Sequence, residues 1–351
     1  MLKSLLALFC LRFPTFLCSF RRPFLPRHNE LFGPRKDYLI MPYVIGVDLG
    51  GTKIYAVLTD LKGQILAQER LLTLTSQGPQ AVIAQLITCI RKLQAALPAE
   101  STLLGVGVGS PGPLDPQTGV IFTSPNMPGW ENIPLRDILQ AQTDLPIVLG
   151  NDANVAALAE RRFGGGKGYH NLIYLTVSTG IGSGIIADGR LLLGRHGMAG
   201  ELGQMILDVG TRASWENLAS GTALAKAAAN AMLKNPDSLL HSLATPQSVT
   251  GAEVAQAAAK GDPLAQFLMQ REAELLGLGL VNAIHIFSPE IVLVGGSVVT
   301  ANPFLLERVR QVVQELAIAD IYRTIPIELT QLGERGGALG AVALLLSELG
   351  L

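Results

Sequence analysis

The sequence has few cysteines, few aromatic residues and almost no net charge. Cys10, Cys18 and Cys89 are the only cysteines among 351 residues, and no two of them have the spacing of metal ligands or of a redox pair. This excludes a disulfide framework and is typical of a protein of the reducing cytoplasm. The formal net charge of -1 gives no electrostatic basis for binding nucleic acid or an anionic membrane.

Long uninterrupted hydrophobic runs are also lacking. Residues 5–20 are apolar, but Arg12 and Pro14 interrupt them and no small-residue cleavage site follows, so we expect no membrane span. Residues 1–40 contain seven Lys/Arg and two Asp/Glu, a net charge of +5. We expect this segment to be a non-globular extension, with translation starting at Met41; a targeting or anchoring segment is the alternative.

The remainder is rich in hydrophobic residues (48%) and contains 38 glycines, enough for two packed cores joined by many tight turns. A strand–turn–strand–turn–strand pattern leading to helical sequence occurs twice. Its ranges are 43–49, 54–59, 64–72 and 79–97 in the first half, then 172–177, 185–187, 190–193 and 215–287 in the second. Further strands are predicted at 103–109, 144–149 and 291–294, and helices at 151–162 and 336–349. The repetition indicates a duplicated α/β architecture with a site between the halves.

The turn after the first strand carries the clearest chemical pattern. Asp48 ends the strand, Gly50 and Gly51 allow positive φ, and Thr52 and Lys53 follow. Bare glycine N–H groups, a hydroxyl and an amine suit phosphate oxygens, and Asp48 suits a magnesium ion, directly or through water. A hairpin turn without a ligand is the alternative interpretation.

A second glycine-rich turn at 178–184, with Ser178, Thr179 and Gly180 at its start, is the predicted partner of the first. Gly295 and Gly296 follow a buried strand and are predicted to lie near a nucleotide base or ribose. The glycines of 105–112 nominally spell G-x-G-x-x-G, but prolines at 111, 113 and 116 forbid the helix that a dinucleotide site needs. We therefore expect a rigid loop there, lining the cleft.

Four polar residues are candidates for binding and activating a substrate hydroxyl. Asn151 and Asp152 follow a hydrophobic strand and open a helix, so they serve either as its cap or as hydroxyl ligand and general base. Glu201 and Glu216 lie in or beside glycine-rich turns, where carboxylates suit sugar hydroxyls; ordinary solvated surface is the alternative.

Taken in order, these segments resemble the ROK family of sugar kinases and related repressors, within the actin/hexokinase superfamily. The resemblance covers residues 43–349. It is carried by DLGGTK (48–53), SPGPLD (110–115), NMPGW (126–130), GNDAN (150–154), GIGSG (180–184), AGELG (199–203) and WENLASG (215–221).

The resemblance implies a two-domain α/β fold of the actin/hexokinase type (ribonuclease H-like), with duplicated mixed sheets and a hinged cleft. The implied domains are 42–155 plus 335–351, and 156–334. It also implies ATP with magnesium at the two phosphate turns, a homodimer, and a hexose held by Asn151, Asp152, Glu201 and Glu216. Asp152 would be the base that lets the 6-hydroxyl attack the γ-phosphate.

One departure from the family pattern concerns zinc. Gln204 stands where the family has a histidine, and residues 208–214 lack the family's cysteine-rich zinc-binding run. Glutamine is a poor zinc ligand, so we expect no structural zinc and expect Gln204 to contact a sugar hydroxyl.

Glucose is the first-choice substrate; fructose, mannose, N-acetylglucosamine and N-acetylmannosamine remain open. Polyphosphate as donor is a second possibility, but it demands a basic track, and Arg161, Arg162 and Lys167 form only a small cluster. A sugar-responsive repressor is the third. Residues 1–40 are too short and too rich in proline for the helix-turn-helix domain of such family members.

Overall fold

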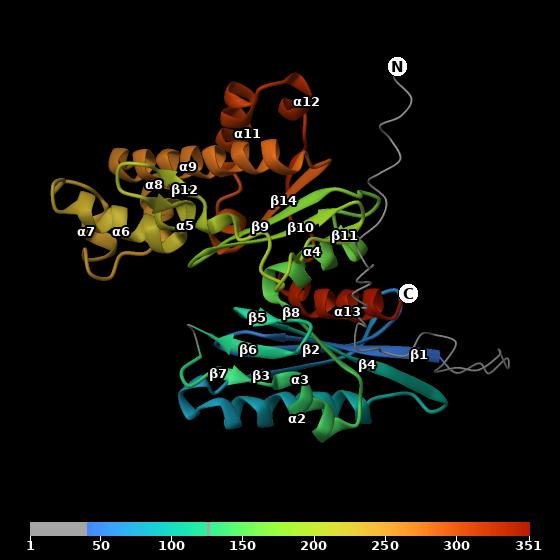
Figure 1. The fold of residues 1–351 in the computed structure, drawn as a ribbon. Helices are drawn as coiled ribbons and strands as arrows, with labels where there is room; N and C mark the ends of the chain where they lie inside the picture. The colour runs from blue at the N-terminus through green and yellow to red at the C-terminus, as the bar shows by residue number, and fades with distance from the viewer. Residues whose placement is uncertain (1–40, 125–126) are drawn as a thin grey trace, which may run out of the picture.

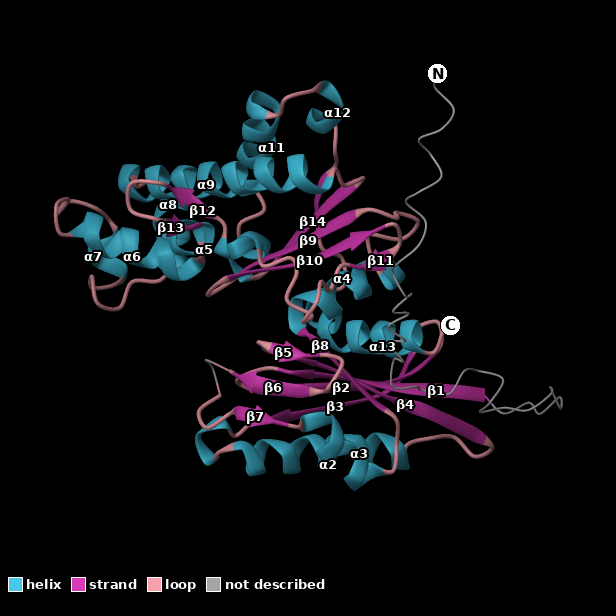
Figure 2. Cartoon of the chain, viewed as in Figure 1, coloured by secondary structure: helices cyan, strands magenta, loops and turns pink. Residues whose placement is uncertain are grey.

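Two five-stranded sheets of the same topology form the framework of the chain (Figures 1 and 2). The computed structural model describes residues 41–124 and 127–351, so the expectation for residues 1–40 lies outside the described residues. The strand orders are β3-β2-β1-β4-β8 and β11-β10-β9-β14-β15. In each sheet three antiparallel strands are followed by two further strands. These two run parallel to β1 in the first sheet and to β9 in the second. The predicted duplication is confirmed.

The first sheet comprises β1 (Met41–Leu49), β2 (Lys53–Asp60), β3 (Ile65–Leu72), β4 (Ser101–Ser110) and β8 (Ile147–Asn151). Its associated elements are η1 (Thr75–Gln77), α2 (Pro79–Ala95), α3 (Leu135–Thr143) and a small sheet of β5 (Leu114–Asp115), β6 (Val120–Thr123) and β7 (Glu131–Ile133). No element was predicted from the sequence for β5–β7 or α3.

The second sheet comprises β9 (Leu172–Val177), β10 (Ile181–Ala187), β11 (Arg190–Leu191), β14 (Ile291–Gly295) and β15 (Ile327–Leu329). The other elements of this half are η2 (Leu202–Gln204), β12 (Ile206–Asp208), β13 (Ala213–Ser214), α5 (Trp215–Ala219), α6 (Gly221–Met232), α7 (Leu240–Leu243), α8 (Gly251–Ala259), α9 (Pro263–Phe287), α10 (Ser297–Ala301), α11 (Leu305–Leu316), α12 (Asp320–Arg323) and η3 (Gly333–Arg335). The helical character predicted for 215–287 is confirmed.

Helices α4 (Asp152–Phe163) and α13 (Gly336–Glu348) lie between the two sheets, as Figure 1 shows. One buried cluster joins them to both sheets, with members such as Val57, Val155, Leu293 and Val342. Two further cores lie on the outer faces: α2 and α3 cover the first sheet, and α5, α6, α8, α9 and α11 cover the second. The middle helices therefore connect the two halves of the molecule.

Two glycine patterns form strand where the sequence predicted a turn or loop. The 178–184 prediction is wrong beyond Gly180, because β10 begins at Ile181. A Cβ on Gly184 would lie 2.7 Å from the backbone oxygen of Ala153, so this glycine allows α4 to approach the strand. Likewise Gly107 is within β4, where a Cβ would overlap the carbonyl of Ala341 in α13. Only the end of 105–112 is loop.

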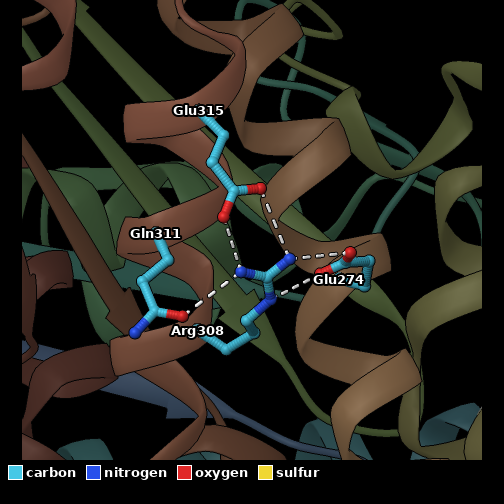
Figure 3. Close-up of polar contacts among 4 residues, drawn as sticks. All are labelled: Glu274, Arg308, Gln311 and Glu315. Atoms are coloured by element: carbon cyan, nitrogen blue, oxygen red, sulfur yellow. Dashed lines mark hydrogen bonds and ion pairs between the residues drawn. The ribbon is translucent and has the colours of Figure 1, made fainter.

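Helices α9 and α11 are joined at their surface by one arginine (Figure 3). Arg308 donates through Nε and Nη2 to the two carboxylate oxygens of Glu274, at 2.8 and 2.9 Å, and through Nη1 to Glu315 at 2.8 Å and Gln311 at 3.2 Å. The two parallel bonds to Glu274 fix the direction of the guanidinium, which exposed ion pairs with a single contact do not achieve.

Among residues 41–124 and 127–351, none of the helices combines the length and apolar character that a membrane crossing requires.

Glu272 is a carboxylic acid in the core of the second half. It is 1% exposed on the inner face of α9, and neither carboxylate oxygen has a hydrogen-bond partner among the described residues. Burial raises its pKa to about 8, with Arg271 opposing the shift. The folded chain therefore keeps a proton on Glu272 over a pH range in which the unfolded chain has released it, so its stability falls as pH rises from 4.5 to about 8.

We predict that Glu272→Gln removes this dependence. The wild type should lose roughly 2–4 kcal/mol of unfolding free energy between about pH 5 and pH 8 through this group, and the variant should not. Denaturant melts at both pH values measure the difference. Glu131→Gln, at an exposed residue, is the control and should follow the wild type. Parallel curves for wild type and Glu272→Gln would show that Glu272 is not buried as a neutral acid.

Candidate active site

The first turn joins β1 to β2 and is held by a residue from another loop. The N–H of Gly50 donates to the carbonyl of Lys53 at 3.0 Å. Thr73, just after β3, donates its hydroxyl to the carbonyl of Gly50 at 2.7 Å and its N–H to Thr52 at 3.0 Å. Neither Gly50 nor Gly51 adopts positive φ, which corrects the expected reason for these glycines. The turn keeps its shape through Thr73.

Asp48, at the end of β1, lies against the first turn of α13. A Cβ on Gly337 would collide with the Asp48 carboxylate, so a residue with a side chain does not fit there. A helix N-terminus favours a nearby carboxylate. Burial nevertheless raises the pKa of Asp48 to about 6; the charge of Asp152 adds to the shift and Lys53 opposes it.

Asn151 and Asp152 occupy the junction of β8 with α4. The side-chain oxygen of Asn151 accepts the N–H of Ala153 at 3.0 Å, so Asn151 is the helix cap. Asp152 accepts the same N–H at 2.8 Å. Water reaches Asp152, yet the surrounding protein removes enough solvent from its carboxylate to raise the pKa, against the lowering effect of the backbone N–H groups.

Glu201, Gln204 and Glu216 come together beside Asp152. Nε2 of Gln204 donates to Oε1 of Glu216 at 3.3 Å, and Oε2 of Glu216 accepts the N–H of Ile181 at 2.8 Å. Burial raises the pKa of Glu201, and the charges of Asp152 and Glu216 raise it further. A group of neighbouring carboxylate and amide side chains can exchange hydrogen bonds with several hydroxyls of one small ligand.

The second turn, Ser178–Gly180, meets two helix N-termini. Ser178 accepts the N–H of Ser297 on its hydroxyl at 3.0 Å, and its carbonyl accepts the N–H of Gly221, the first residue of α6, at 2.7 Å. Thr179 accepts the hydroxyl of Thr222 on its carbonyl at 2.7 Å. A side chain on Gly180 would strike the Glu216 carboxylate, so this turn touches the acidic group directly.

Gly295 and Gly296 lie beside this turn because β9 and β14 are parallel neighbours. Gly296 has a φ of 88°, which side chains disfavour, and a Cβ there would overlap the backbone of Val177. Both the conformation and the space therefore require glycine. The carboxyl ends of parallel strands meet at one edge of a sheet, which is where ligands bind in open α/β sheets.

Lys53 is turned toward η3. Its amine lies 3.4 Å from Glu334, which also pairs with Arg70 at 3.2 Å. Both side chains of the Lys53 pair are more than half exposed, so the interaction contributes little to stability and leaves the amine free to move.

The segment expected to lack zinc forms the hairpin β12–β13. Its turn is closed by Asp208, which accepts the hydroxyl of Thr211 at 2.6 Å and the N–H of Gly210 at 2.9 Å. Within 41–124 and 127–351, no group of three or more His, Cys, Asp or Glu residues could hold a metal ion.

Sequence reasoning missed three residues of this site. Thr73 and Gly337 act through contacts with residues far away in the chain, which no local pattern reports. Tyr174 lies in β9, and burial raises the pKa of its hydroxyl to about 12, opposed by a hydrogen bond with Thr176 and increased by nearby carboxylates including Asp152. Its alternation with buried residues in a strand gave no chemical signal.

We predict opposite effects for alanine at two adjacent glycines. Gly336→Ala should stabilise the fold by about 0.5–1 kcal/mol, because the new methyl group meets only Leu332 at 3.8 Å in a helical position. Gly337→Ala should cost about 1–3 kcal/mol, because the methyl group displaces the Asp48 carboxylate. Denaturant melts of both variants measure the difference. Equal stabilisation would mean that Asp48 does not lie against α13.

The chain is similar to known proteins of one family. A model of the ROK family matches residues 44–348. A glucokinase from Thermotoga maritima is 34% identical over 315 residues, which cover 88% of this chain and 98% of that protein. A xylose repressor from Caldicellulosiruptor bescii is 29% identical over 337 residues, covering 94% of this chain and 82% of the repressor.

The solved structure of a ROK family glucokinase from Streptomyces griseus, in complex with glucose and AMPPNP, matches with a TM-score of 0.72. It is 30% identical, and the match covers 86% of this chain and 98% of that one. The chain belongs to the ROK family, and the predicted two-domain actin-like fold is confirmed.

Proposed function

We propose that this member of the ROK family is a sugar kinase that transfers phosphate from ATP to a hexose, with glucose as the first choice. The observation that carries the proposal is the meeting of Asp152 with Glu201 and Glu216 next to the turn Ser178–Gly180. The names of the Thermotoga and Streptomyces relatives support both the reaction and the sugar.

Asp152 would act as the general base. Its raised pKa makes the carboxylate a better proton acceptor than an ordinary aspartate. In phosphoryl transfer the protein contributes mainly positioning, and a carboxylate takes the hydroxyl proton as the new bond forms. Asn151, Glu201, Gln204 and Glu216 would hold the other hydroxyls and fix which oxygen faces Asp152.

The two turns would hold the phosphates of ATP. Thr52 and Lys53 would bind from the first half, with the Lys53 amine leaving Glu334, and the N–H groups of 178–180 from the second. Gly295 and Gly296 would lie against the nucleoside. Asp48 suits magnesium delivered with ATP, because such sites use one or two carboxylates plus substrate phosphates, and the ion would neutralise the transferred charge.

We also propose the domain division 42–155 plus 335–351 and 156–334. The packing of α13 on β1, β4 and β8 supports placing it with the first half. Closure of the two parts around sugar and ATP would exclude water, the competing acceptor.

Two alternatives remain distinct from this proposal. The similarity to a xylose repressor favours a sugar-responsive regulator, but the acidic residue at 152 and the two turns are what a kinase needs. Polyphosphate as donor needs a basic track to the site. Arg161 and Arg162 lie in the last turn of α4, about 14 Å along the helix from Asp152, so they do not form a basic track to the site.

We also propose that the protein is cytoplasmic, that it forms a homodimer and that it acts in glycolysis. The exposed apolar side chains Phe267, Ile286, Leu316, Ile318 and Ile321 on and beside α9 and α11 are compatible with an interface. The oligomeric state stays a prediction.

We predict that the full chain releases ADP from magnesium-ATP in a coupled assay only when a hexose is present. Asp152→Asn should lower kcat by about 10²–10⁴-fold, because the amide cannot accept the proton. Asp237→Asn is the matched control at an exposed aspartate and should leave kcat unchanged. A panel of glucose, fructose, mannose, N-acetylglucosamine and N-acetylmannosamine identifies the sugar.

A folded wild type that is inactive with every sugar would exclude the ATP-dependent kinase. Repeating the panel with polyphosphate would then test the second donor, and a DNA shift assay at stated salt would test the regulator. Full activity of Asp152→Asn would remove Asp152 from the mechanism while leaving the kinase assignment intact.

We further predict an acidic limb in the pH profile of kcat/KM. Protonation of Asp48, with its pKa near 6, and of Asp152, whose pKa is also raised, removes the charges that hold magnesium and accept the proton. Activity should therefore fall as pH decreases through about 6, well above the ordinary aspartate range near 4. A profile that stays flat down to about pH 5 would contradict these pKa shifts.

A further inference from the structure

A cavity of about 830 Å³ lies at the end of α4 and α13 that is remote from Asp152. Its volume is within the range of sites for small organic ligands. The lining comes from four places: the last turns of α4 and of α13, the turn at 168–170 before β9, and the β10–β11 hairpin. No residue proposed above for sugar or ATP binding lines it.

More positive than negative groups line the cavity. Arg161, Arg162 and Arg190 contribute three guanidinium groups, against the carboxylate of Glu348 and the terminal carboxylate of Leu351. In the part of the chain that the structure describes, none of the three arginines has an acidic side chain within 4.0 Å. Guanidinium groups that line a concavity with no acidic side chain beside them attract anions.

Arg161 is the most informative of these residues. Its Nε is buried and has no hydrogen-bond partner among the described residues. A Cβ on Gly189 would lie 2.9 Å from Nη2 of Arg161 and 3.3 Å from Nδ1 of His170, so both groups face the same point of the hairpin. A buried N–H without a partner is costly. Arg161 lines the cavity through other atoms of its side chain, which a ligand oxygen can reach.

The helix dipole of α4 does not explain the whole group. Arg161 and Arg162 are in the last turn, where positive side chains complement the dipole. Arg162 also donates to a terminal oxygen of Leu351 at 2.8 Å. Arg190 comes from β11, on a different element, and the dipole gives no reason for its position. Its guanidinium adds a third positive charge to the same cavity.

The lining also includes the apolar side chains of Leu158, Leu191, Leu193 and Leu344. An occupant therefore has an anionic group and a small organic body. Residues 1–40 of the chain are an unsuitable occupant, because their net charge of +5 repels the arginines. Guanidinium groups bind phosphate oxygens with paired hydrogen bonds. We propose that this cavity is a binding site for a small organic phosphate, separate from the sites of ATP and sugar.

The position of the site couples it to the rest of the molecule. Both α4 and α13 begin at the acidic group, beside Asp152 and Asp48, and both end in the cavity. The β10–β11 hairpin belongs to the second sheet. A bound phosphate contacts the middle helices and the second sheet together, and so stabilises one arrangement of them. Binding does not rest on the proposed kinase function; an effect on the kinase does.

The experiment is calorimetric titration of the full chain, without sugar or nucleotide, with 3-phosphoglycerate, pyrophosphate and inorganic phosphate as probes. We expect 3-phosphoglycerate to bind and to raise the melting temperature. Arg161→Gln and Arg190→Gln should each weaken binding about tenfold or more, and Glu348→Gln should strengthen it. Arg190 is exposed, so its variant tests the site even where Arg161→Gln disturbs folding.

Two control variants distinguish binding in this cavity from a general attraction of anions to surface charge and from binding at the acidic site. Lys167→Gln removes one exposed charge next to the cavity without altering its lining and should bind like the wild type. Asp152→Asn should also bind normally, whatever its activity. The proposal is overturned if none of the three probes binds at low millimolar concentration, if Lys167→Gln loses as much affinity as Arg190→Gln, or if Asp152→Asn alone changes binding.

Discussion

The rest of the structure depends on the contact between α4 and α13, which is made at its closest points without side chains. Gly340 of α13 lies against the backbone carbonyl of Val155 in α4, and Gly107 of β4 lies against that of Ala341 in α13. A methyl group at either glycine would overlap these carbonyls. Because the backbones approach so closely, two helices fit between two sheets with a packed core on each side.

This arrangement also brings the acids together, at an electrostatic cost. Asp152 is the first residue of α4, and Asp48 lies against the first turn of α13. The charge of Asp152 acts on Asp48, and Glu201 and Glu216 approach from the second half. Close like charges with little solvent raise the pKa of Asp48 and of Glu201 and destabilise the fold. The surrounding cores offset that cost, which is the usual relation between a reactive site and its scaffold.

Residues could be placed from the sequence where a chemical pattern lies at the end of a strand or the start of a helix. Asp48 before a turn and Asn151–Asp152 at a strand–helix junction were located correctly because strand ends and helix caps have local signals. Gly182 and Gly184 were misassigned, since a glycine that accommodates a helix packed on a strand looks the same in sequence as one in a turn. Gly107 lies in the strand that was predicted at 103–109. Elements such as β5–β7 are two to four residues long, too short for a periodic signal.

Helix α4 shows which electrostatic effect dominates at each end. Its dipole favours a carboxylate at the N-terminus and cations at the C-terminus, and Asp152 and the pair Arg161–Arg162 follow that preference. The dipole contributes only about 0.3–1 kcal/mol at such positions, and the pKa of Asp152 is raised rather than lowered. Loss of solvent therefore outweighs the dipole at the acidic end. At the basic end it lowers the pKa of Arg162, with the charge of Arg161 adding to the effect. Helix α4 thus carries an acidic group at one end and a basic group at the other, and both have lost solvent. A hydroxyl at the acidic end or an anion at the basic end would replace the missing water.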